Sequence, residues 1–332
     1  MENQIKSISL ELTNRCNLLC KHCSTNASPN GEIFLDLNTV KKLLQESKKH
    51  GAKYLSLSGG EPLLHPQIAE ILKYADNLNY KIDLYTSGIV DQIKLEDSKL
   101  MDSLKEYVDT LIFSLYSDSK KIHDYITNVK GSFKRTLQAI KIAKLVGIST
   151  EVHVVPMSVN YKKIPNIIKL LKSYDINRIS LLRLVPQGRC LDNIDLMMNK
   201  NQSLELRKIV KDYEEDNKIT NIRKGAPYKC LFFDEASHCS AGKDKLLISP
   251  NGDVHPCESF KSGKSESNIK EKSLIEIWQK DTMLNEIRTI DYDKISSCRN
   301  CQQLSKCLGG CPGQRWLKYD DFNIGPDPAC VI

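Results

Sequence analysis

The chain has 332 residues, of which 40% are hydrophobic, and this is enough for one large core or two smaller ones. The formal net charge is +7, but the lysines are spread through amphipathic segments such as VKKLLQESKKHG, so we expect a solvated surface and no nucleic-acid partner. No apolar run is long enough to cross a membrane and the N-terminus lacks signal-peptide features, so we expect a cytoplasmic protein without membrane attachment.

Predicted strands and helices alternate through the first half of the chain. The apolar residues alternate in six segments that we predict as strands, each with its following turn: 5–12, 54–62, 81–88, 110–117, 149–160 and 178–188. Between these strands the apolar residues recur at helical spacing, so we predict helices in 37–51, 68–79, 102–108, 133–147 and 164–175. A parallel neighbour needs a crossover, so these units predict a parallel sheet. Six units, not eight, predict an α/β fold built as an open, partial (β/α)6 TIM-like barrel.

The most distinctive residue groups of this half follow the predicted strands. They are the cysteines of TNRCNLLCKHC (13–23), GGEP (59–62), TSG (86–88), SLYS (114–117) and PQGR (186–189). Because the carboxyl ends of parallel strands meet at one edge, we expect these groups to converge on one rim, where such folds carry their chemistry.

Twelve cysteines are many for a chain in a reducing compartment, so metal ligation or redox chemistry is the first interpretation. Cys16, Cys20 and Cys23 fall within eight residues. Thiolates suit zinc and iron–sulfur clusters alike, but structural zinc takes a fourth ligand. His22 is adjacent to Cys23 and would have difficulty reaching the same metal. Three thiolates that leave one iron of a cube open to a small molecule are therefore the better explanation.

The spacing C-x3-C-x2-C after strand one, with GGEP after strand two, resembles the radical S-adenosylmethionine (SAM) enzymes. The resemblance implies that Cys16, Cys20 and Cys23 ligate a 4Fe-4S cluster whose fourth iron binds the amino and carboxylate groups of SAM. It also implies that one electron from an external flavodoxin- or ferredoxin-type donor cleaves SAM to methionine and a 5′-deoxyadenosyl radical, which abstracts a substrate hydrogen. The SAM contacts implied are Gly59, Gly60 and Glu61 for the amino group, Ser114 and Arg135 for the carboxylate, His22 for the adenine, Val185 and Gly188 for the adenosine side, and Ser87 for the ribose.

The residue types fit these roles, although simpler roles stay open. Glycines at 59 and 60 allow a close backbone approach to a ligand, and a guanidinium such as that of Arg135 pairs with a carboxylate. Without the family pattern Arg135 would be read as an exposed helix charge and His22 as a surface residue. Ser87 and Ser114 would equally serve turn amides.

The C-terminal third resembles the SPASM extension of the same enzymes, which typically holds two auxiliary 4Fe-4S clusters, giving three clusters in all. Cys239, Cys257 and Cys311 would hold the nearer cluster, with Cys230 as the candidate fourth ligand. Cys298, Cys301, Cys307 and Cys330 would hold the farther one. Cys230 has two other interpretations, a hydrogen donor to a substrate radical or a plain buried thiol, and Cys190 has the same three, with an inert thiol favoured. A zinc ribbon is the alternative for this region, but seven cysteines overfill one tetrahedral site. The segment LLISPNGDVHPCESF predicts a hairpin with an Asn-Gly turn.

We expect three parts: the barrel in 1–189, a helical linker in 190–228 and the auxiliary-cluster domain in 229–332. Relatives with this extension mostly modify peptides or proteins, so the resemblance implies a peptide maturase that crosslinks, epimerises or oxidises a ribosomally made peptide. The alternative is a small-molecule dehydrogenase or epimerase acting on a sugar or aminocyclitol; a non-catalytic electron carrier would not explain GGEP. The chain begins at strand one, so a leader peptide would be recognised by a partner or by the barrel itself.

Few acid–base candidates emerge from the sequence. Glu258 directly follows Cys257, where sulfatase-maturing relatives have an aspartate base, but it serves equally as a structural carboxylate. His123 and Asp124 of KIHDYI are expected to position or cap, and His153 to be a satisfied core histidine more often than a substrate contact.

Overall fold

The computed structural model describes residues 4–89, 98–217, 222–233, 239–262 and 265–332. Within these residues the strands form one sheet in the order β7-β6-β5-β4-β3-β2-β1-β8-β9. Neighbouring strands are parallel except for the pair β8 and β9, which is antiparallel. The strands are β1 (Ser7–Glu11), β2 (Tyr54–Ser58), β3 (Lys81–Thr86), β4 (Thr110–Ser114), β5 (Thr150–Val154), β6 (Ile179–Leu181), β7 (Ile222–Lys224), β8 (Lys245–Ile248) and β9 (Val254–His255).

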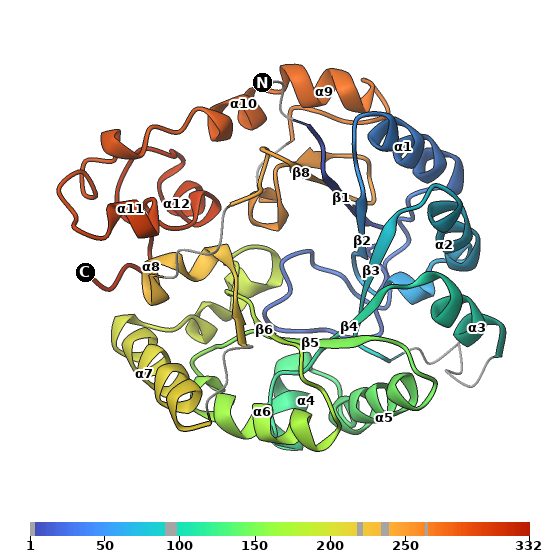
Figure 1. Cartoon of the computed structure of the whole chain (residues 1–332), viewed down its shortest axis with the longest axis horizontal. Coiled ribbons are helices and arrows are strands. Elements are labelled where there is room, and N and C mark those ends of the chain that lie inside the picture. Colours follow the sequence, from blue (N-terminus) through green and yellow to red (C-terminus); the bar gives the residue numbers. More distant parts are fainter. Residues whose placement is uncertain (1–3, 90–97, 218–221, 234–238, 263–264) are drawn as a thin grey trace.

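The sheet curves, and its helices lie on the outside (Figure 1). Successive strands from β1 to β6 are joined through the helices α1 (Leu37–Lys49), α2 (Ile68–Asn77), α3 (Ser98–Tyr107), α4 (Lys120–Thr127), α5 (Ser132–Leu145) and α6 (Ile164–Ser173). The helix α7 (Lys200–Asn217) precedes β7. This arrangement confirms the predicted partial barrel.

The alternation read from the sequence separates the two faces of the sheet. Leu10, Leu57 and Leu84 are fully buried and belong to the large core between sheet and helices. Neighbouring side chains on each strand point the opposite way, so Glu11 and Tyr85 face the interior of the barrel. Full burial of one such leucine contributes about 1.5–3 kcal/mol, so this face fixes the register of each strand.

The C-terminal third is attached to the same sheet. Strand β8 lies beside β1, with Lys245 opposite Ser7, and turns into β9 through the Asn251–Gly252 segment. The predicted hairpin is therefore confirmed. Its place in the barrel sheet depends on the pairing of β8 with β1, whose residues are far apart in the chain. The Leu274 amide donates to Glu46 Oε2 of α1 at 3.0 Å, which ties the start of α9 to the barrel.

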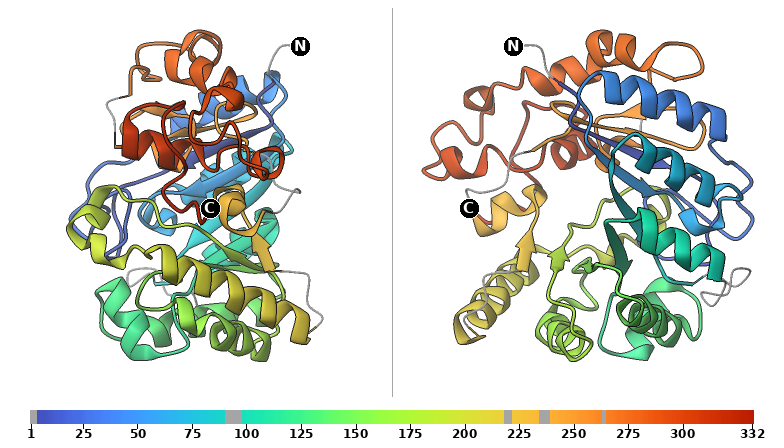
Figure 2. Two further views of the ribbon diagram at one scale, coloured as in Figure 1. Left: turned by 90° about the vertical axis from the view of Figure 1, so that its left-hand side faces the viewer. Right: turned by 45° about the vertical axis from the view of Figure 1, so that its right-hand side comes forward.

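Residues 298–332, which we call the cysteine-rich segment, lie at the open side of the curved sheet, beside α8 (Lys229–Phe232) (Figures 1 and 2). This segment contains α11 (Leu304–Cys307) and α12 (Pro312–Tyr319). The helices α9 (Leu274–Lys280) and α10 (Thr282–Arg288) precede it, and α9 packs beside α1. Phe260 packs on Trp316 and Phe322 with tilted rings, at centroid distances of 5.7 and 5.8 Å, and the three rings belong to a small core of their own. The predicted linker contains α7 and the strand β7, and the two boundaries between the three predicted parts stay predictions. None of the helices in the described part of the chain has the length and apolar character that crossing a membrane requires.

Candidate functional site

Cys16, Cys20 and Cys23 lie in the loop that follows β1. The Cys16 amide donates to Ser28 O at 2.9 Å, and the Cys23 amide to Cys20 O at 3.2 Å, so the loop folds back on itself. Burial, together with the nearby Glu61 carboxylate and Cys23, raises the pKa of Cys16 to about 12. Burial and the neighbouring Cys16 and Cys23 raise the pKa of Cys20 well above its usual value. Thiols with raised pKa values, as at Cys16 and Cys20, become thiolates only beside a strong positive charge, as iron ligation supplies.

Arg189, which sequence analysis noted in PQGR without a role, holds this loop from the far side of the barrel. Its Nε donates to Cys20 O at 3.0 Å, and its Nη2 and Nη1 donate to Ala27 O at 2.6 and 3.1 Å. The guanidinium also acts to lower the pKa of both Cys16 and Cys20. Its position depends on a contact across 169 residues, which a local motif does not reveal.

The glycines after β2 allow close contact with the loop that carries Cys16, Cys20 and Cys23, which we call the cluster loop. The Gly60 amide donates to Thr13 O at 2.6 Å and the Glu61 amide to Arg15 O at 2.7 Å. A Cβ on Gly59 would lie 2.5 Å from Thr13 O, and one on Gly60 would lie 2.1 Å from Arg15 O. We expected Gly59 and Gly60 to allow a close backbone approach to a ligand. In this structure they allow a close approach to the loop that carries the cysteines.

The Glu61 carboxylate is fully buried and receives several hydrogen bonds. It accepts from Thr86 Oγ1 at 2.8 Å, and from the Ser87 amide and hydroxyl at 2.9 and 2.7 Å. Burial raises its pKa, although the Ser87 and Thr86 hydrogen bonds act in the opposite direction. Glu61 thus connects the end of β2 to the end of β3, and Ser87 is fixed by this carboxylate.

A group of three rings lies beside the cluster loop. The His22 ring meets Tyr116 edge-on at 4.5 Å, and Tyr116 stacks on His123 at 5.6 Å. Burial lowers the pKa of both histidines to about 4, so both are neutral near pH 7. Within the described residues, His22 Nδ1 and His123 Nε2 are buried without a hydrogen-bond partner. Ser114 ends β4 and hydrogen-bonds to Tyr116.

Gly188 and Arg135 reach this rim from other elements. Gly188 has φ +59° and packs on the cluster loop, since a Cβ there would lie 2.7 Å from Ser24 C. The Val185 carbonyl accepts from the Gln187 amide at 2.9 Å. Arg135 is half-buried on α5, next to Thr136, whose hydroxyl donates to Ser87 O at 2.9 Å.

Asp124 holds the start of α5. Its carboxylate accepts from the Gly131 and Phe133 amides and from the Ser132 hydroxyl at 2.7–2.9 Å. The predicted capping role of Asp124 is thereby confirmed.

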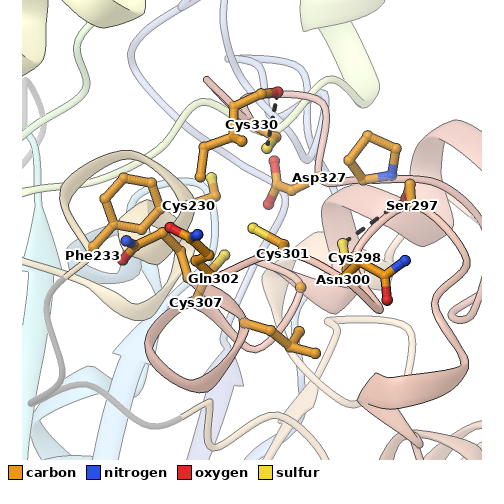
Figure 3. A pocket seen from close by; sticks show the side chains of 15 residues that line it. Cys230, Phe233, Ser297, Cys298, Asn300, Cys301, Gln302, Cys307, Asp327 and Cys330 are labelled. Carbon is orange, nitrogen blue, oxygen red and sulfur yellow. Dashed lines mark hydrogen bonds between the residues drawn. The ribbon is translucent and has the colours of Figure 1, made fainter.

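The cysteines assigned to the farther cluster line one cavity of about 630 Å³. Figure 3 shows Cys298, Cys301, Cys307 and Cys330 around it, together with Cys230 and Asp327. Burial, then Asp327 and Cys330, raise the pKa of Cys307 to about 12. The four thiols that the resemblance assigns to the farther cluster therefore line one cavity.

The nearer group is also brought together. Besides burial and the Glu258 carboxylate, the neighbouring Cys311 and Cys239 raise the pKa of Cys257. Cys230 is fully buried, and both Cys307 and Cys311 act on its pKa. It thus lies between the two groups and lines the cavity of the farther one, so its place as a ligand of the nearer cluster stays a proposal. Among the described residues, no three His, Cys, Asp or Glu side chains are grouped as the ligands of a single metal ion.

The remaining candidates differ in their access to the barrel. Cys190 is fully buried in an apolar cluster, and burial raises its pKa to about 11, as suits an inert thiol. Glu258 is half-exposed and pairs with Lys245 at 2.9 Å. Burial alone would raise the Glu258 pKa, but the Lys245 ammonium lowers it to about 2, which makes this carboxylate a weak base. His153 Nε2 donates to Glu151 Oε1 at 2.8 Å, and the ring packs on Tyr85.

Comparison with known families agrees with this geometry. The radical SAM superfamily model matches residues 10–171, and the SPASM iron-sulfur cluster-binding domain matches residues 239–302. The chain is a radical SAM enzyme with a C-terminal SPASM domain. It therefore has the domains that bind SAM and iron–sulfur clusters.

Two characterised relatives match almost the whole chain. The AdoMet-dependent heme synthase of Methanosarcina barkeri is 25% identical over 356 residues, covering 100% of this chain and 97% of that protein. The PqqA peptide cyclase of Gluconobacter oxydans is 25% identical over 331 residues, covering 98% of this chain and 90% of that protein.

Two solved structures share the fold of the radical SAM/SPASM chain. Streptococcus suis SuiB bound to S-adenosylmethionine has a TM-score of 0.80 at 22% identity, covering 99% of this chain and 78% of SuiB. The enzyme anSMEcpe with bound AdoMet has a TM-score of 0.75 at 17% identity, covering 98% of this chain and 94% of that chain.

Proposed function

We propose that this radical SAM/SPASM enzyme modifies a ribosomally made peptide, using three 4Fe-4S clusters. When bound, the first cluster supplies the electron that cleaves SAM and so generates the radical that abstracts a substrate hydrogen. Cys16, Cys20 and Cys23 would ligate that cluster. The two auxiliary clusters would be held by Cys230, Cys239, Cys257 and Cys311 and by Cys298, Cys301, Cys307 and Cys330.

The protein's own residues would bind and orient SAM at the rim. Gly59, Gly60 and Glu61 would meet the methionyl amino group through their backbone, since the Glu61 carboxylate is already occupied by Thr86 and Ser87. Ser114 and Arg135 would contact the carboxylate. The unpartnered Nδ1 of His22 supports its proposed contact with the adenine, and the backbone at Val185 and Gly188 would contact the adenosine. Ser87 would contact the ribose.

The gathering of two separate auxiliary cysteine groups is the observation that carries the peptide proposal. The resemblance associates such a full set mainly with peptide modification, and one relative that matches over 98% of this chain is named a PqqA peptide cyclase. An external one-electron donor of the flavodoxin or ferredoxin type would reduce the first cluster. Glu258 is a candidate base, but its ion pair with Lys245 makes a positioning role better supported.

A small-molecule substrate is the second candidate. A relative of equal identity is named an AdoMet-dependent heme synthase, so the identity of the relatives alone does not decide between the two substrate classes. A sugar or an aminocyclitol, the alternative substrate considered from the sequence, belongs to this same class.

The test is anaerobic incubation of the reconstituted enzyme with SAM, a reductant and each short peptide encoded beside its gene. The peptide proposal predicts 5′-deoxyadenosine formation that rises with the peptide, and a mass change in the peptide that requires SAM. Turnover of a porphyrin precursor or a sugar, with every such peptide unchanged, would contradict it.

A further inference from the structure

Arg315 is a buried charge that the proposed chemistry does not use. It lies on α12, four residues after Cys311, and its side chain is fully buried. A guanidinium stays protonated in proteins, so this position holds a positive charge away from water. Such a charge is costly unless opposite charge and hydrogen-bond acceptors surround it.

Protein groups satisfy only one of its three nitrogens. Nη1 donates to Gly309 O at 3.0 Å. Nε and Nη2 are buried and have no hydrogen-bond partner in the described part of the chain. Two directional donors therefore point at positions where the protein offers no acceptor.

The nearest carboxylate is already neutralised. Both oxygens of Asp327 are bonded to Arg183, at 2.7 Å each, in a pair that is almost fully buried. Asp327 also accepts from the Cys311 amide at 2.7 Å and the Ala329 amide at 2.8 Å. Arg315 is therefore a second buried cation, for which Asp327 has little hydrogen-bonding capacity left.

Burial lowers the Arg315 pKa, and after Asp327 the acidic groups that oppose this shift are Cys298 of the farther group, Tyr292 and Cys311 of the nearer group. Gly309, whose added Cβ would lie 2.1 Å from Arg315 Nη1, lines the cavity of the farther group. The guanidinium thus lies against the wall of that cavity at Gly309.

We propose that Arg315 is a positioning residue that donates hydrogen bonds from Nε and Nη2 to sulfur atoms of the auxiliary clusters and raises their reduction potential. The inference rests on the auxiliary clusters of the proposed function. A 4Fe-4S cluster with four thiolates is anionic and gains one more negative charge on reduction, so a fixed cation and two donors favour the reduced form. A higher potential makes these clusters better acceptors for an electron that leaves a substrate radical.

The test is a redox titration of the auxiliary clusters alone. The parent is the chain with Cys16→Ala, Cys20→Ala and Cys23→Ala, which should hold about eight irons in two cubes. Dithionite is the titrant, and the paramagnetic resonance of the reduced clusters is the readout. In Arg315→Gln we expect at least one midpoint to fall by about 59 mV or more, a tenfold change in the equilibrium constant of a one-electron couple. The midpoint of Arg315→Lys, which keeps the charge, should lie between the midpoints of the parent and of Arg315→Gln.

Arg288 provides the matched control. It is also a partly buried arginine with one unpartnered nitrogen, but its bonded partners are Gly242 O, Trp278 O and Asn285 Oδ1. Arg288→Gln should leave both midpoints within a twofold change in the equilibrium constant.

Unchanged midpoints in Arg315→Gln at parental iron content would overturn the proposal. If Arg315→Gln does not retain about eight irons, Arg315→Lys decides: a fall of threefold or more in the equilibrium constant supports the proposal, and an unchanged midpoint overturns it. A parent that never binds more iron than a trace would instead refute the auxiliary clusters themselves. The two failures are therefore distinguishable.

Discussion

At the scale of single residues, the buried carboxylate of Glu61 links the GGEP turn after β2 to the end of β3, at the rim where we propose that SAM binds. Glu61→Gln replaces one acceptor oxygen by a donor, which faces either Thr86 or Ser87, and both of these residues already donate. Each buried group left unsatisfied costs about 1–3 kcal/mol, so we expect the dissociation constant for SAM to rise at least tenfold. Equilibrium binding to the reconstituted enzyme measures it. The exposed Glu32→Gln is the control, and SAM affinity equal to wild type in Glu61→Gln would contradict this role.

His123 makes a second prediction, about pH. Burial lowers its pKa from its ordinary value of 6.5 to about 4. Between these pH values His123 is therefore protonated in the unfolded chain and neutral in the folded chain. Stability from this residue is therefore complete above pH 6.5 and is lost as the pH falls toward 4, by up to about 3 kcal/mol. His123→Asn keeps an acceptor for the Tyr116 amide but does not titrate. Denaturant unfolding at pH 7 and pH 5 should show a smaller difference in the variant, and an equal difference would contradict the assignment.

The sequence was sufficient for residues whose role is local. Cys16, Cys20, Cys23 and the glycines of GGEP were identifiable because their spacing and their place after a strand carry the information. Arg189 and Asp327 could not be assigned a role, because their partners lie far away in the chain: Asp327, for example, pairs with Arg183 across 144 residues. Arg315 bonds to nearby Gly309, but its full burial depends on tertiary packing that the local pattern does not encode. Burial and unpaired donors appear only once those segments meet.

At the scale of elements, the loop after β1 depends on supports from two other parts of the rim. The GGEP turn binds it through Thr13 and Arg15, and Arg189 binds it through Cys20 and Ala27. The strands and helices of the barrel were predictable because the period of the apolar residues changes between them. The addition of β7 and β8 to the same sheet was not, since three- and four-residue strands pair through contacts that the local pattern does not encode.

Arg189→Gln tests the support of this loop. The variant leaves the Cys20 and Ala27 carbonyls without their charged donor, and such hydrogen bonds contribute about 1.5–3 kcal/mol. We expect a chelator to remove the iron of the first cluster at least tenfold faster, while the auxiliary clusters keep theirs. Iron release followed by absorbance measures both phases. Arg223→Gln, exposed on β7, is the control, and release at the wild-type rate in Arg189→Gln would show that the loop stands without this support.

At the scale of the whole molecule, the buried ion pair between Arg183 and Asp327 helps to join the barrel to the cysteine-rich segment. Arg183 follows β6, and Asp327 lies three residues before Cys330; the two side chains are 7% and 1% exposed. Asp327→Asn leaves the Arg183 charge buried without its partner, which costs about 3–5 kcal/mol. We expect that loss in the free energy of unfolding, together with loss of auxiliary iron.

Asp175→Asn provides the comparison for this prediction. Asp175 pairs with Lys144 at 2.8 Å, but its side chain is 77% exposed. Removal of a surface pair changes stability by about 1 kcal/mol or less. Denaturant unfolding and iron counting of the two variants separate the cases, and equal effects would refute a joining role for Asp327.

The most direct measurement for the whole account is SAM cleavage by the anaerobic, reduced, fully reconstituted protein. Wild-type protein should contain about twelve irons in three cubes and produce methionine and 5′-deoxyadenosine, more of both with its substrate. Cys20→Ala should retain about eight irons and produce neither. Absence of 5′-deoxyadenosine from wild-type protein with twelve irons and substrate, or its undiminished formation by Cys20→Ala, would contradict the account.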